Sequence, residues 1–309
     1  MKETTSKANV VVKKKISTRK MHDWFAAYVF IAPLVIGLGL FYVFPFVQNI
    51  WFSFNDVNKF NVATFAGLDN YKRLFTDPNL LNALWNTIKY VLITTPVGLG
   101  LSLLIAALLN TKIKGTSFYR TIYFLPAVTM PVAIALVWKF IFNGDYGLLN
   151  NFLKIFGIHG KSWLSDANTA LYMVMIVAIW SSVGYNVIIL LAGMQGISRT
   201  YYEAAAIDGA GPAVQFFKIT IPMVSPTLFF VLITGLIGGF QVFDSIYMLV
   251  GVDNPIFEKV QTLNIMFYRN GFQYGYKGYA AAISVFMFAL IMIVTVVQLI
   301  GQKKWVNYE

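Results

Sequence analysis

Six apolar stretches, each long enough to cross a lipid bilayer as a helix, alternate with polar segments along the chain. They run approximately over residues 24–54, 84–109, 122–142, 171–193, 228–250 and 280–300. A helix needs about 20 mostly apolar residues to span the hydrocarbon core, and backbone inside lipid is satisfied only in helices or closed barrels. The pattern predicts an all-α integral membrane protein with six transmembrane helices.

The first apolar stretch follows a basic segment and could be mistaken for a secretory signal peptide. Its apolar run is too long for a signal sequence, and no small-residue cleavage site follows it. We therefore expect a retained helix that is bent or broken near Pro45.

Composition supports a membrane protein and narrows its chemistry. Hydrophobic residues make up 58% of the 309 residues and charged residues 12%, against roughly 25% charged residues in soluble domains; mean hydropathy is +0.65. The chain has no cysteine, which excludes disulfides, thiolate metal sites and cysteine nucleophiles. With His22 and His159 as the only histidines, we expect no metal site.

The distribution of basic residues predicts the orientation of the chain. Fourteen of the 24 lysines and arginines fall on the side of the two termini, and eight fall on the other side. Positive loops are retained in the cytoplasm, so both termini are predicted to be cytoplasmic. This gives a basic cytoplasmic tail (1–23), a six-span domain (24–301) and a short cytoplasmic tail (302–309).

Three loops on the outer side, 55–83, 143–170 and 251–279, are longer than simple connections. Loops of this length are often functional. They could equally form short helices that lie on the lipid headgroups, and the sequence leaves both interpretations open.

The cytoplasmic loop 198–222, between spans four and five, has strong local structure signals. Thr200 and Glu203 have the spacing of a capping box that begins a helix, and Gly209 can adopt the positive φ that ends one. Pro212 suits the first position of a second short helix. A first helix of about two turns is marginal alone, so its apolar and small residues suggest a partner surface.

Polar residues inside the predicted spans are candidates for a substrate cavity. Ser181, Ser182 and Tyr185 share one face of span four. Span five carries several glycines, which indicate either close helix packing or room for a substrate, and then Gln241 and Asp244. Asp244 either lines a cavity or caps nearby backbone. Lys89 and Lys139 lie near outer span ends, where snorkelling explains them.

The 198–222 loop resembles the Glu-Ala-Ala loop of permease subunits in ATP-binding-cassette (ABC) importers. The matching residues are Glu203-Ala204-Ala205, Asp208-Gly209-Ala210, Phe217, Ile219, Ile221 and Pro222. The amino-acid sequence of the loop is similar to that of permeases in the carbohydrate-uptake branch, which includes the maltose and glycerol-phosphate permeases. Segments 67–71, 124–126, 243–247 and 278–282 resemble that branch too, so the likeness covers about 25–300; segment 251–255 departs from it.

The resemblance implies a role for each group of residues. The loop would dock into a separate ATPase subunit through Tyr201, Glu203, Ala204, Ala205, Asp208, Gly209 and Ala210. The sugar would cross a cavity lined by Ser181, Ser182, Tyr185, Gly239, Gln241 and Asp244. No dense cluster of basic residues appears in the spans, so an anionic substrate is less expected.

The expected function is the permease subunit of a binding-protein-dependent importer for a sugar or oligosaccharide in the bacterial cell membrane. No P-loop sequence occurs, so we expect no enzymatic activity and no cofactor here, with ATP and Mg held by a dimeric partner ATPase. Further implied partners are a second permease and an extracellular or periplasmic solute-binding protein. A polyol or glycerol phosphodiester importer and an ion-coupled secondary transporter are the alternatives.

Overall fold

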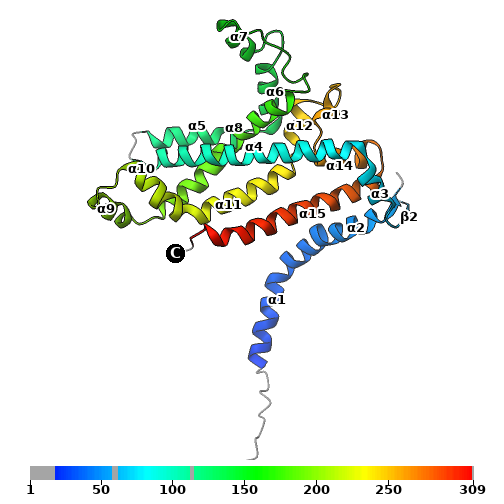
Figure 1. The fold of residues 1–309 in the computed structure, drawn as a ribbon. Helices are drawn as coiled ribbons and strands as arrows, with labels where there is room; N and C mark the ends of the chain where they lie inside the picture. The colour runs from blue at the N-terminus through cyan, green and yellow to red at the C-terminus, as the bar shows by residue number, and fades with distance from the viewer. Residues whose placement is uncertain (1–17, 58–61, 112–114, 308–309) are drawn as a thin grey trace, which may run out of the picture. The chain divides into compact units, whose positions relative to one another are not determined.

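The computed structural model describes residues 18–57, 62–111 and 115–307, so most of the predicted tail 1–23 and residues 308–309 lie outside the described residues. The described chain consists mostly of helices (Figure 1). It divides into two compact units, Met1–Trp51 and Phe52–Glu309, which are described separately.

The first apolar stretch forms one helix of 31 residues, Asp23–Ser53. It includes most of α1 (Thr18–Leu38), then a π-helical turn η1 (Gly39–Val43) and α2 (Phe44–Ser53). The backbone N–H of Phe44 bonds to the carbonyl of Gly39. Proline clashes with the carbonyl four residues earlier, and a π turn absorbs such a disruption. The predicted disturbance near Pro45 is thus a π turn that ends two residues before it, and the helix is not broken.

Four more helices are long and apolar enough to cross a membrane: Pro78–Leu109, Ala170–Gln195, Pro212–Phe240 and Lys277–Lys304. They contain α4 (Pro78–Leu109), α8 (Ala170–Gln195), α11 (Ile221–Phe240) and α15 (Lys277–Gly301), the last followed by the short η4 (Gln302–Lys304). These helices correspond to predicted spans two, four, five and six; those of spans two, four and six extend beyond the predicted bounds at one or both ends.

The third predicted span, 122–142, is not one straight helix. It forms α5 (Thr116–Val128) and α6 (Pro131–Ile141), bent by 99° at the break between them. Pro131 occupies the start of α6, and the residue before a proline is disfavoured in helical conformation. The described residues therefore contain five unbroken candidate spans and one bent pair.

The fifth predicted span, 228–250, is wrong at both ends. The helix begins at Pro212 with α10 (Pro212–Gln215) and continues through the π turn η2 (Phe216–Thr220) into α11. Pro222 therefore does not mark a boundary, because η2 absorbs it as η1 absorbs Pro45. At the other end the helix stops at Phe240, and α12 (Asp244–Leu249) is separate.

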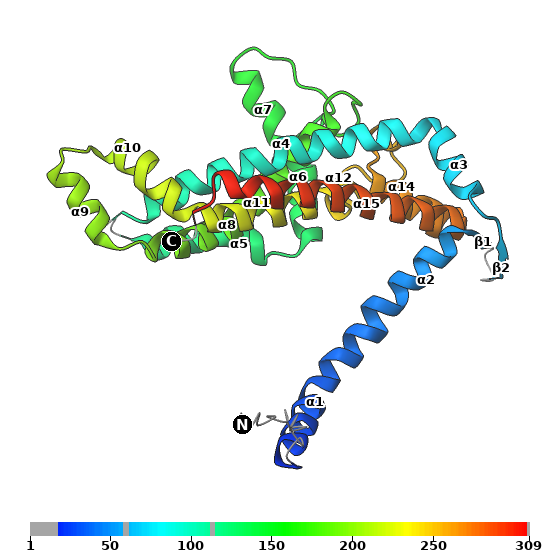
Figure 2. The ribbon, with the colours of Figure 1, turned by 60° about the horizontal axis from the view of Figure 1, so that its bottom comes forward.

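The helices of the Phe52–Glu309 unit pack around α4, α8 and α11, which lie side by side in Figure 2. Small residues allow the closest approaches: Gly193 of α8 faces Thr227 of α11, and Gly184 of α8 faces the Tyr123 carbonyl of α5. One buried cluster, which includes Leu190 and Val224, joins the three helices. This close packing of small residues is typical of membrane helices.

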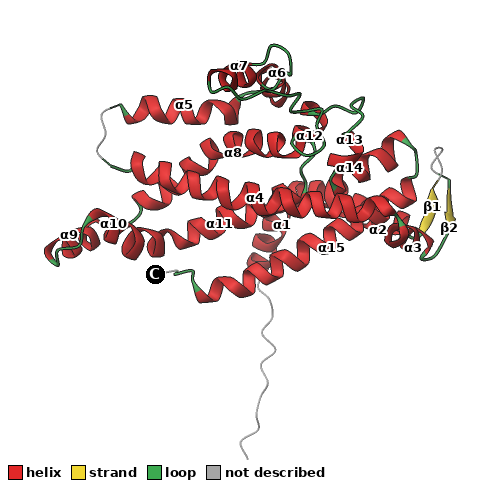
Figure 3. Cartoon of the chain, turned by 45° about the horizontal axis from the view of Figure 1, so that its top comes forward, coloured by secondary structure: helices red, strands yellow, loops and turns green. Residues whose placement is uncertain are grey.

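Short elements cover the two ends of this unit (Figure 3). One end, called here the α9 end, carries α9 (Arg199–Ile207) and α10. The other, called the α3 end, carries the ribbon β1 (Asn55–Val57) and β2 (Ala63–Phe65) with α3 (Asp69–Thr76). The strands are antiparallel, with Asp56 opposite Thr64. The α7 helix (Leu148–Ile155) follows α6.

The loop after α12 is folded against protein. It forms α13 (Phe257–Val260), α14 (Leu263–Tyr268) and the π turn η3 (Arg269–Gln273). The Asn86 amide of α4 donates to the carbonyl of Gln261 at 3.0 Å, and the Leu263 N–H donates to Thr87 Oγ1 at 3.0 Å. Leu263 and Ile265 are buried completely. The short helices of this outer loop are therefore held by contacts with α4 and by buried side chains of their own.

Candidate functional site

A cavity of about 390 Å³ lies between α4, α8 and α11. Its wall combines hydroxyl, amide and aromatic groups with small residues. They include Tyr90, Thr94 and Thr95 of α4, Ser182 and Asn186 of α8, Gly235, Gly238 and Gly239 of α11, and Gln241 to Ser245 after it. We call this the first cavity.

A second cavity, of about 370 Å³, lies on another side of α8. Pro126, Thr129 and Pro131 from the α5–α6 bend line it, with Ser181 and Tyr185 of α8 and with Asp244, Ser245, Met248 and Leu249 of α12. The bend in the third apolar stretch therefore builds one wall of this cavity.

Asp244 and Ser245 line both cavities. They occupy the start of α12, directly after the break that ends α11. Among the described residues, no lysine or arginine lines either cavity, and Lys89 and Lys139 are absent from both walls. The break therefore brings an exposed carboxylate to the place where the two cavities meet, and their other lining residues are uncharged.

The predicted cavity residues fall into two groups. Ser182, Gly239, Gln241 and Asp244 line the first cavity. Ser181 and Tyr185 line the second, so the single face predicted for span four serves two cavities. The Ser182 hydroxyl also donates to the carbonyl of Ile179 at 2.9 Å.

Sequence reasoning missed the contribution of α4. Tyr90, Thr94 and Thr95 line the first cavity, although none was a candidate. Asn86, Tyr90, Thr94, Gly98 and Ser102 recur every four residues. This spacing puts polar and small groups on one helix face, so the pattern was readable in the sequence.

The glycines of α11 both allow close helix packing and leave room beside the helix, the two roles that the sequence left open. A Cβ atom added at Gly235 would lie 3.1 Å from Thr95 Cγ2, and one at Gly239 would lie 3.1 Å from Val91 Cγ2. Both glycines also line the first cavity. They therefore allow α11 to approach α4 closely and leave space beside the contact.

The α9 helix begins two residues earlier than expected. Ser198 is its N-cap and accepts a hydrogen bond from the N–H of Thr200, so Thr200 and Glu203 are not the capping pair. Gly209 has φ of 78° and follows the helix as predicted, and Pro212 begins α10. Glu203 of α9, the helix labelled in Figure 1, is exposed and lines a hollow of about 600 Å³ with Arg199.

The α9 helix exposes two large apolar side chains. Tyr201 is 52% exposed and Ile207 is 87% exposed. Ala204 is exposed and Ala205 is half-buried, so the alanines add little bulk. Tyr201 and Ile207 therefore present apolar surface outside the packed core.

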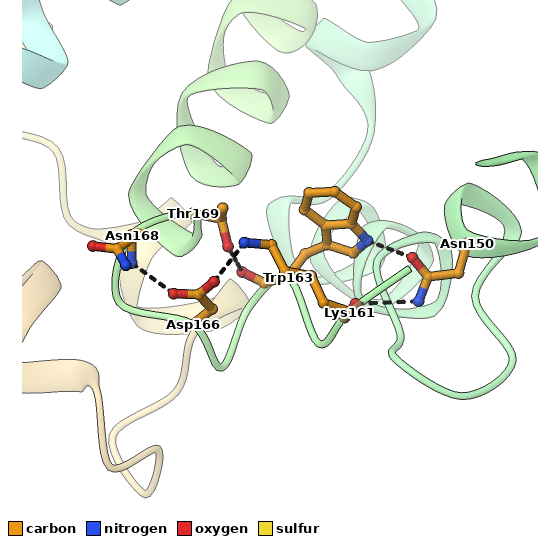
Figure 4. Close-up of polar contacts among 6 residues, drawn as sticks. All are labelled: Asn150, Lys161, Trp163, Asp166, Asn168 and Thr169. Atoms are coloured by element: carbon orange, nitrogen blue, oxygen red, sulfur yellow. Dashed lines mark hydrogen bonds and ion pairs between the residues drawn. The ribbon is translucent and has the colours of Figure 1, made fainter. Parts of the chain in front are cut away.

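A polar network orders the loop between α7 and α8 (Figure 4). The buried Asn150 side chain donates to the carbonyl of Lys161 at 3.1 Å and accepts from Trp163 Nε1 at 2.6 Å. Lys161 pairs with Asp166 at 2.5 Å. The hydrogen bonds from Lys161 and from the Asn168 N–H lower the pKa of the Asp166 carboxyl.

Among the described residues, no group of three or more His, Cys, Asp or Glu side chains is arranged to hold a metal ion. The site therefore offers hydrogen-bonding and aromatic groups for binding.

Residues 98–306 match the family described as binding-protein-dependent transport system inner membrane component. The chain is 35% identical over 301 residues to the probable ABC transporter permease protein YesP of Bacillus subtilis, covering 96% of each chain. It is 35% identical over 285 residues to the sn-glycerol-3-phosphate transport system permease protein UgpA of Escherichia coli, covering 91% of this chain and 95% of the relative.

The fold is similar to that of a solved bacterial ABC transporter involved in the import of the acidic polysaccharide alginate. The TM-score is 0.84 at 22% identity, over 94% of this chain and 99% of that chain. A solved bacterial alginate ABC transporter in complex with an alginate pentasaccharide-bound periplasmic protein gives a TM-score of 0.83.

Proposed function

The chain belongs to the family of binding-protein-dependent transport system inner membrane components, and on that premise we propose that it carries a sugar or oligosaccharide across the cell membrane as one permease subunit of an ATP-driven importer. The first cavity supports this proposal most directly. Its hydroxyl, amide and aromatic wall suits a neutral sugar, which has polar edges and an apolar ring face.

Polar and aromatic residues of the cavity walls would bind different parts of the sugar. Thr94, Ser182 and Gln241 offer hydrogen-bond partners, and Tyr90 offers an aromatic surface. Tyr185 would stack on the sugar from the second cavity. We propose that the two cavities form this chain's half of the pathway, completed by a second permease.

We propose that α9 couples the pathway to a separate, dimeric ATPase, which would hold ATP and Mg. The apolar surface around Tyr201 and Ile207 would enter a cleft on that subunit. Glu203 would anchor the contact, and Gly209 would allow the tight turn that follows, because its φ is unfavourable for other residues. ATP-driven movement of α9 would then open the cavities to one side at a time.

The proposed orientation places the α9 end and both termini in the cytoplasm, with the α3 end outside. Its support is the charge bias of the sequence. The α3 end would receive the extracellular or periplasmic solute-binding protein.

Uptake by the assembled importer in proteoliposomes tests the proposal. The solutes are radiolabelled maltotriose, raffinose, xylotriose and sn-glycerol-3-phosphate. Gly209→Arg and Glu203→Lys should abolish uptake and ATPase co-purification while the chain still inserts in the membrane, because neither residue satisfies the backbone of a span. Gly211→Ala is the matched control, since no atom lies within 4 Å of an added Cβ there. Normal uptake by the Gly209→Arg protein would contradict the coupling role.

A polyol or glycerol phosphodiester is the second candidate solute, because relatives of this chain are named for sn-glycerol-3-phosphate. Phosphate binding usually uses arginine, lysine or backbone N–H groups. Uptake of sn-glycerol-3-phosphate without uptake of the three sugars would favour this candidate.

A further inference from the structure

Four aromatic rings outside the predicted site form a continuous series at the α3 end. The Phe243 and Tyr247 rings of the α12 region are stacked, with centroids 5.1 Å apart and planes at 23°. Tyr268 of α14 contacts both, at 4.9 Å from Phe243 and 5.4 Å from Tyr247. Phe272 of η3 stacks on Tyr268 at 5.5 Å and 22°. We call these four rings the aromatic ladder.

The ladder connects the molecular surface with the first cavity. Its inner ring, Phe243, is part of the cavity wall. Its outer ring, Phe272, is 71% exposed at the α3 end. Tyr247 and Tyr268 between them are half-buried, so each keeps part of its surface exposed.

Hydrogen bonds hold the two segments of the ladder in register. The Asn264 amide donates to the Gln241 carbonyl at 2.7 Å, and the Thr262 hydroxyl donates to the Val242 carbonyl at 3.3 Å. Both acceptors belong to the break between α11 and α12. The α14 segment, which carries Tyr268, is therefore hydrogen-bonded to the same break between α11 and α12 that lines the first cavity.

We infer that the aromatic ladder is a binding track along which a sugar moves between the outer surface and the first cavity. A sugar ring presents an apolar face that can lie on an aromatic ring, while its hydroxyls bond to polar groups at the edge. Tyrosine offers both surfaces in one side chain. A series of similar, weak sites permits movement from one to the next, whereas a single tight site would retain the sugar.

This inference rests on the proposed function. A sugar track and an ordinary packed cluster of aromatic rings make different demands on the side chains. A packed cluster needs only the volume of the rings. A track requires that the inner rings be accessible to water. It also requires flat aromatic faces for the sugar to lie on, which an aliphatic side chain of similar volume does not provide. Two experiments separate these requirements.

The first experiment uses the absence of cysteine in the chain. Tyr247→Cys and Tyr268→Cys are made singly in the assembled importer and treated with 2-sulfonatoethyl methanethiosulfonate. Both thiols should react, and maltotriose, raffinose or xylotriose should slow the reaction if transported. Ile265→Cys, on the same α14 helix but 0% exposed, is the unreactive control. Inner thiols that are as unreactive as residue 265 would overturn the inference, whatever the importer carries.

The second experiment measures uptake. Phe272→Ala should lower sugar uptake roughly two- to tenfold, the factor that corresponds to one aromatic contact, without changing thermal stability. Phe156→Ala of α7 is the matched control, because Phe156 is 64% exposed, contacts the ring of Phe152 and lies away from the α3 end. Tyr268→Phe should retain uptake that Tyr268→Leu loses.

The outcomes distinguish the two proposals. Uptake of none of the three sugars by the parental importer would refute the proposed function, while cysteine reactivity would still decide whether the ladder is an open track. Parental uptake together with unchanged uptake in Phe272→Ala and Tyr268→Leu would refute the ladder alone.

Discussion

Replacing Gly184 by alanine tests how the bent third stretch is held against the bundle. A Cβ atom at this position would lie 2.0 Å from the backbone oxygen of Tyr123 and 3.1 Å from the Cα of Phe124. Real Cβ atoms essentially never approach another heavy atom within 3.0 Å. Because both neighbours are backbone, α5 would have to move away from α8 by about 1 Å.

The cost of that movement is about 1–3 kcal/mol, the range for inserting a methyl group into well-packed structure. The Gly184→Ala protein should lose this much unfolding free energy when it is titrated with a denaturing detergent in mixed micelles. Uptake should fall as well, because α5 leads into Pro126 and Thr129, which line the second cavity.

Gly100→Ala of α4 is the matched control. No atom lies within 4 Å of an added Cβ at Gly100, and alanine is the better helix former by up to about 1 kcal/mol. This variant should be as stable as the parent or more stable. If Gly184→Ala is equally stable, α5 does not lie against α8 as the structure places it, and the wall assigned to the second cavity is wrong.

Three other changes test the pathway and the orientation. Gly239→Trp should block uptake by filling the first cavity, with sugar binding to the solute-binding protein unchanged; parental uptake would remove Gly239 from the pathway. Tyr185→Ala should weaken uptake severalfold by removing a stacking surface and leave ATPase docking intact, as co-purification would show. Ala206→Cys should be labelled by a membrane-impermeant thiol reagent only in inverted vesicles, and labelling of intact cells would reverse the proposed topology.

The sequence predicted the class of fold because membrane insertion depends on local composition. Five apolar stretches of sufficient length form unbroken helices, since a helix satisfies its backbone within lipid without help from distant residues. The turn after α9 was predictable for the same reason, because single residues determine it. Gly209 adopts positive φ and Pro212 starts a helix, as their covalent structures favour. The family resemblance of this loop is also confirmed by the match over residues 98–306.

Hydropathy could not predict where apolar segments change direction. Hydropathy treats residues 122–142 as one span, yet the chain bends by 99° before Pro131. Conversely, Pro45 and Pro222 do not break their helices, because π turns absorb them. Whether a proline bends, starts or only disturbs a helix depends on the packing around it. Hydropathy averages only the polarity of neighbouring residues in the sequence, so it carries no information on that packing.

The cavities depended entirely on tertiary structure. Helical spacing correctly grouped Ser181, Ser182 and Tyr185 on α8, but the neighbours of that helix assign Ser182 to one cavity and the other two to another. The aromatic ladder unites Phe243 with Phe272, 29 positions apart. Local sequence determines which groups a helix presents along its length, whereas the helices packed against it determine which of those groups share a space.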